Sequence, residues 1–61
     1  MKHTYKNVMV NTELGPRPFT DLFIRYNDKC LYSRFHGTLS QFDIKQFCEM
    51  TKQRLKKEGK L

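Results

Sequence analysis

Aromatic and arginine side chains recur at every second position in segments of this sequence that are rich in strand-forming residues. Phe23 stands two residues before Arg25, Tyr32 stands two residues before Arg34, and Tyr5 lies in a similar segment near the N-terminus. Because residues two apart in a strand point to the same face of a sheet, we expect these five side chains to share one face. Aromatic rings stack on nucleic-acid bases, and guanidinium groups pair with phosphates. The pattern therefore predicts a surface that binds nucleic acid.

A second candidate surface lies near the C-terminus, where Lys52 and Lys56 are one helical turn apart and Lys57 follows. Phosphate binding is one interpretation of this basic helix end. The other, which we favour, is a solvated helix end whose cations complement the helix dipole. Phe42 falls on the polar side of the same helix, where it either contacts a partner or is covered by the segment 11–18. We favour the covering segment.

No arrangement of residues in this sequence is typical of catalysis. There is no glycine-rich phosphate loop, no pair of carboxylates at catalytic spacing and no histidine with a credible nucleophile. We therefore expect a protein that is not an enzyme and that uses no cofactor. Cys30 and Cys48 are too few for a disulfide framework, and no metal-binding spacing of cysteine and histidine occurs. With no apolar run long enough to span a membrane, we expect a reduced, cytoplasmic protein.

These candidate residues must be positioned by a helix that the sequence predicts over about residues 41–58. Ser40 is an N-cap residue with Asp43 at the capping-box position, and Gly59 suits the helix end. Apolar or small side chains then follow at helical spacing and form the predicted core stripe of the helix: Ile44, Phe47, Cys48, Thr51 and Leu55.

Three segments before the helix favour strands, at about residues 4–10, 19–26 and 30–36. Residues 11–18 contain a glycine and two prolines, and we interpret them as a loop. Short connections favour an antiparallel meander, so the predicted fold is α+β, a three-stranded sheet covered on one face by the C-terminal helix, in a single small domain spanning 1–61. The side chains that we expect beneath the helix are Val8, Val10, Leu22, Ile24, Leu31 and Phe35. The opposite face would then carry the five predicted binding residues and Met9.

The composition favours an acidic partner, because 12 Lys and Arg oppose 6 Asp and Glu, giving a formal net charge of +6. Nucleic acid is our first hypothesis. The alternative is a protein-interaction module, such as a phage- or mobile-element-encoded inhibitor or adaptor that docks on an acidic host protein. A third hypothesis is a homodimer in which the open sheet faces of two copies pack against each other.

Two loose resemblances accompany this outline. The hairpin followed by His36-Gly37-Thr38-Leu39-Ser40 and a helix resembles small phage-encoded inhibitors of uracil-DNA glycosylase, which mimic DNA by being acidic, whereas this chain is basic. The three-strand-plus-helix outline is also similar, in architecture only, to the DNA-binding arms of some integrases.

Overall fold

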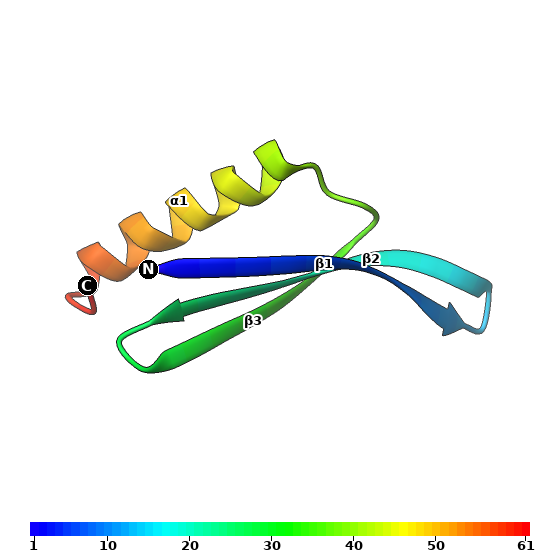
Figure 1. Cartoon of the computed structure of the whole chain (residues 1–61), viewed down its shortest axis with the longest axis horizontal. Helices are drawn as coiled ribbons and strands as arrows, with labels where there is room; N and C mark the ends of the chain where they lie inside the picture. Colours follow the sequence, from blue (N-terminus) through cyan, green and yellow to red (C-terminus); the bar gives the residue numbers. More distant parts are fainter.

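The computed structural model describes all residues from 1 to 61 and consists of a three-stranded antiparallel sheet followed by one helix. The elements are β1 (Lys2–Thr12), β2 (Gly15–Tyr26), β3 (Lys29–His36) and α1 (Gln41–Lys57), and the strand order is β1-β2-β3. The helix lies across one face of the sheet and leaves the other face uncovered (Figure 1). The predicted α+β class and the meander are confirmed. No helix has the length and apolar character needed to cross a membrane.

The start of α1 is fixed by the predicted capping box. The backbone N–H of Asp43 donates to Ser40 Oγ at 3.2 Å, and the N–H of Ser40 donates to Asp43 Oδ2 at 3.2 Å. Two backbone donors that the helix cannot satisfy internally thereby gain partners. The helix ends at Lys57, and Gly59 adopts a φ of 75° shortly after it.

The core lies between α1 and the middle of the sheet. Leu22 and Ile24 of β2 pack with Ile44 and Cys48 of α1. Around this centre lie four partly buried apolar side chains: Leu31, Phe35, Leu39 and Phe47. Only nine of the 61 residues are buried, because a single helix can cover only one face of the sheet.

Thr20 fixes the connection between the sheet and the helix. It is fully buried, and its Oγ1 lies 2.8 Å from Asn7 Oδ1 and 3.0 Å from the carbonyl oxygen of Gly37, while it accepts from the N–H of Leu39 at 3.0 Å. Gly37 has a φ of 87°, a left-handed conformation that glycine adopts without steric cost. The chain can therefore leave β3 and turn sharply towards the start of α1.

The interpretation of residues 11–18 as a loop is wrong. β1 continues to Thr12, residues 13–14 form a tight turn, and β2 begins at Gly15, so Pro16 and Pro18 lie within a strand. The carbonyl of Pro18 accepts from the N–H of Gly37, which shows that Pro18 directs its backbone groups towards the β3 side. The backbone groups of Pro16, two residues earlier, point to the same side of β2, where β3 no longer runs alongside. Neither proline therefore removes a backbone N–H that a neighbouring strand needs as a donor.

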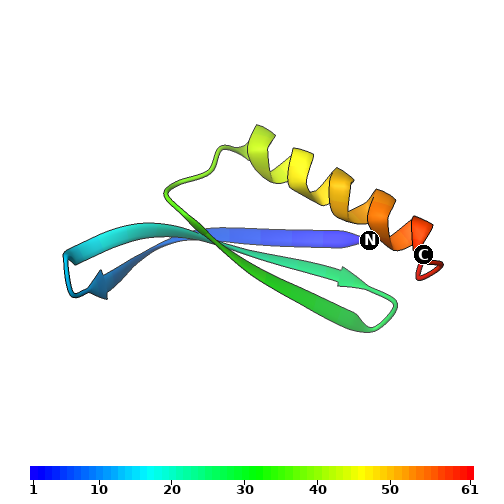
Figure 2. The ribbon, with the colours of Figure 1, turned by 180° about the vertical axis from the view of Figure 1, so that it is seen from behind.

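Residues 9–18 consequently form a two-stranded arm that projects past the start of α1 (Figures 1 and 2). The molecule is elongated as a result, with principal extents of 42 × 22 × 16 Å. The arm lies away from the helix, so it cannot cover Phe42, which is 68% exposed.

The predicted faces of β1 are also wrong. Tyr5 pairs with Leu22 and Met9 pairs with Pro18, which places both on the helix side of the sheet. Val8, paired with Phe19, lies on the uncovered face, and so does Val10, two residues further along β1. The predicted faces of β2 and β3 are confirmed, with Leu22, Ile24, Leu31 and Phe35 towards the helix.

Candidate functional site

The uncovered side of the sheet, which we call the open face, gathers most of the candidate residues. Its members follow from the pairing register. They are Lys2, Thr4, Lys6, Val8, Val10 and Thr12 of β1; Arg17, Phe19, Asp21, Phe23 and Arg25 of β2; and Cys30, Tyr32, Arg34 and His36 of β3.

Residues paired across the strands form rows on this face, and rows that contain lysine or arginine recur every four residues along the strands. Lys2 lies opposite Arg25 in the first row. Lys6 and Arg34 flank the central strand in the second row, and Arg17 lies in the third. At a rise of about 3.4 Å per residue, neighbouring cationic rows are about 14 Å apart.

Aromatic rows lie between the cationic ones. Phe23 pairs with Tyr32, and their ring centroids are 5.1 Å apart with an interplanar angle of 33°. Phe19 pairs with His36, with centroids 4.9 Å apart. Cations and rings therefore alternate along the strands at steps of about 7 Å.

Asp21 is the only acidic side chain of the open face, and its charge is neutralised by Arg34. It is 4% exposed and receives hydrogen bonds from Arg34 Nε at 2.6 Å, Arg34 Nη2 at 2.9 Å and the Tyr32 hydroxyl at 3.0 Å. The hydrogen bonds from Arg34 are the main reason that the pKa of Asp21 lies below its usual value, and the same bonds raise the pKa of Arg34. Arg34 also lies over the Phe19 ring, 5.5 Å from its centroid.

The other cations of the open face are not held in ion pairs, although Lys6 lies opposite Asp21 and its charge contributes to lowering the pKa of that carboxyl group. Lys2, Lys6, Arg17 and Arg25 form no ion pair, since the two ion pairs of the chain join Arg34 to Asp21 and Lys60 to Glu58. The open face therefore keeps a net positive charge, with five lysine and arginine side chains against one carboxylate.

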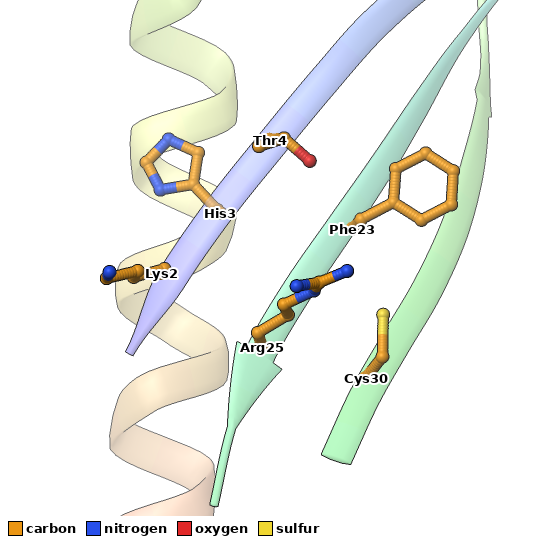
Figure 3. Close-up of a pocket in the computed structure, with 6 residues that line it drawn as sticks. All are labelled: Lys2, His3, Thr4, Phe23, Arg25 and Cys30. Atoms are coloured by element: carbon orange, nitrogen blue, oxygen red, sulfur yellow. The ribbon is translucent and has the colours of Figure 1, made fainter. Parts of the chain in front are cut away.

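A pocket of about 330 Å³ opens at the start of β1, next to the first cationic row (Figure 3). Phe23 and Thr4 line one end of it, and Arg25, Lys2 and the thiol of Cys30 line the other. The sixth lining residue, His3, extends from the other face of β1, towards α1. The pocket has an apolar wall and two cationic groups, a combination that suits an anionic ligand with a flat ring.

The structure separates the predicted binding residues into two groups. Phe23, Arg25, Tyr32 and Arg34 come together on the open face, as expected. The remaining five lie on the helix side of the sheet or on α1 itself: Tyr5, Phe42, Lys52, Lys56 and Lys57. Lys52 lines a separate hollow of about 290 Å³ between α1 and β1. The basic helix end and the open face are thus different surfaces.

Several open-face residues were missed from the sequence. Phe19 and Asp21 belong to the same set of alternate positions in β2 as Phe23 and Arg25. Extending this every-second-residue pattern back along the strand could have found them. Lys2 and Lys6 required the correct register of β1. Potential metal ligands do not gather: no three His, Cys, Asp or Glu side chains lie close enough to hold one ion.

No protein-family model, curated protein or solved structure matches this chain.

Proposed function

We propose that this chain is a small nucleic-acid-binding protein and that the open face is its contact surface. The observation that carries the proposal is the set of four cations outside any ion pair, Lys2, Lys6, Arg17 and Arg25, on a face whose single acid is paired with Arg34. Lysine and arginine side chains bind phosphates by displacing condensed counterions, which makes nucleic acid the natural ligand of such a surface.

The distribution of charge favours an acidic ligand over a second copy of the chain. A two-fold partner would bring the same face against itself, so the unpaired cations of each copy would approach like charges. Like charges brought together in an interface oppose association. A polyanion lying along the strands would instead neutralise all four.

The lysines of the basic helix end provide an internal control for the cations of the open face. Lys56 and Lys57 are exposed on α1, on the far side of the sheet from the open face. A ligand bound along the strands does not reach them.

The test is a fluorescence-anisotropy titration with a labelled oligonucleotide at several salt concentrations. Removing one cation that binds a phosphate reduces the slope of log affinity against log salt by about 0.7 for a single strand and about 0.9 for a duplex. We expect Lys6→Ala to reduce the slope by about this amount and Lys57→Ala to leave it unchanged. Absence of binding at low salt would refute the proposal.

A protein-interaction module, such as an inhibitor or adaptor of a host protein, is the second candidate. One observation favours it: Phe42 and Met50 are each about two-thirds exposed on α1, although both are large apolar side chains. The discriminating experiment is a pull-down from nuclease-treated host lysate. A stoichiometric protein partner that is lost with Phe42→Ser and kept with Lys6→Ala would favour this candidate over nucleic acid.

A further inference from the structure

We infer that the ligand of the open face is single-stranded nucleic acid whose bases stack on the aromatic rows while its phosphates meet the cationic rows. This inference rests on the proposed function, because it specifies which form of nucleic acid the same surface binds. The juxtaposition that supports it is the alternation of cations and rings along one direction of the sheet.

The order of the rows follows the order of groups along an extended single strand. The row of Lys2 and Arg25 is followed by Phe23 and Tyr32, then by Lys6. The alternation then continues through Phe19 and His36 to Arg17, so that it spans about 27 Å along β2. In a single strand the bases can be splayed away from the backbone onto such rings. In a duplex the base faces are stacked inside the helix, and the rings would find no partner.

Tyr32 is the ring best placed to receive a base. Its side chain is 54% exposed, it lies beside Phe23, and its hydroxyl is held by Asp21 at 3.0 Å. The hydrogen bond fixes the ring at its edge and leaves ring surface accessible. A ring that is already ordered loses little conformational freedom when a base stacks on it.

Arg34 extends the stacking surface to the next aromatic row. Both of its hydrogen-bonded nitrogens are committed to Asp21, and its guanidinium lies over Phe19. A guanidinium plane held in this way is itself a surface on which a base can stack. Arg34 is therefore assigned to base stacking, whereas Lys2, Lys6, Arg17 and Arg25 are assigned to phosphates.

The test compares an oligothymidine with a duplex of the same length, using the full chain and two matched variants. Tyr32→Leu removes an exposed tyrosine ring from the open face, and Tyr5→Leu removes a partly exposed tyrosine ring from the helix side of the sheet. We expect Tyr32→Leu to weaken single-strand binding by about 5- to 150-fold, the usual range for one stacked base. Tyr5→Leu should leave the affinity unchanged, and the duplex should bind more weakly than the single strand.

Two further measurements keep the inference falsifiable if Tyr32→Leu does not fold. Tyr32→Phe retains the ring without the hydroxyl, and it should retain most of the single-strand affinity. Tyrosine emission of the Tyr5→Leu variant should be quenched by oligothymidine, because a base stacks on Tyr32. Tighter binding of the duplex, or unchanged single-strand affinity and emission, would overturn the single-strand assignment and leave the proposed function standing. Absence of binding to either oligonucleotide would overturn both.

Discussion

Replacing Asp21 by asparagine removes the only negative charge of the open face while almost preserving the shape of the side chain. In the native chain, Asp21 binds both Nε and Nη2 of Arg34, so this arginine offers no net charge to a ligand. The uncharged amide of the Asp21→Asn variant would not hold the guanidinium as an ion pair. Arg34 would then become available to phosphates, and we expect nucleic-acid binding to depend more steeply on salt.

The size of the effect follows from the number of free cations. Lys2, Lys6, Arg17 and Arg25 form no ion pair, so the native face can neutralise up to four phosphates. Four contacts to a single strand predict a slope of about −2.8 in log affinity against log salt, and a fifth from Arg34 predicts about −3.5. Between about 50 and 200 mM salt, affinity should therefore fall about 50-fold for the native chain and about 130-fold for Asp21→Asn.

The assay is the anisotropy titration with oligothymidine at salt concentrations across that range, after circular dichroism has shown that the variant is folded. Asp21→Asn combined with Arg34→Gln is the control, because it lacks both charges and should return the slope to the native value. A slope that is unchanged in the folded Asp21→Asn variant would refute the description of Arg34 as a cation neutralised by Asp21.

Three further predictions concern the fold. Ile44→Ala should cost about 2–5 kcal/mol of unfolding free energy, because Ile44 is fully buried; urea denaturation measures this loss, and a cost below about 1 kcal/mol would contradict the assigned core. Cys30 should react at once with a thiol reagent, whereas Cys48, whose pKa is raised by burial, should react only on unfolding; equal rates would contradict this assignment. The pKa of Asp21 is lower in the folded chain than its usual 3.8, so its ionised form stabilises the fold above about pH 4, and this contribution is lost as the pH falls through the folded pKa. Acid titrations in urea should show a smaller loss of stability for Asp21→Asn than for the native chain, and equal losses would contradict the lowered pKa.

The helix could be predicted from local signals alone. Ser40 and Asp43 form the capping box that their spacing indicates, and the predicted stripe from Ile44 to Leu55 faces the core. These signals depend on residues within a few positions of one another, so no tertiary information is needed.

Which side chains of β1 face the helix could not be predicted in the same way, because apolar residues occur in both sets of alternate positions of this strand. Val8 and Val10 suggest one inward face, and Tyr5 and Met9 suggest the other. The choice depends on pairing with β2, where Tyr5 lies opposite Leu22. A shift of one residue exchanges the two faces of a strand, which is why Tyr5 was assigned to the wrong surface.

The arm and the charge network at Asp21 also depend on long-range structure. Pro16 and Pro18 are normally strand breakers, and they are tolerated only because β3 ends before it reaches them. Asp21 is separated from Arg34 by 13 positions, and nothing local to either residue indicates their pairing. The general character of the open face could thus be predicted, whereas the division of its cations into free and neutralised groups required the structure.

Chemical-shift mapping tests the central proposal most directly. On adding oligothymidine at low salt to the isotopically labelled chain, we expect the largest amide and side-chain shifts at Lys6, Phe23 and Tyr32, and none at Lys56 or Lys57. Shifts concentrated at the helix end, or no shifts anywhere, would contradict the proposal that the open face is the nucleic-acid-binding surface.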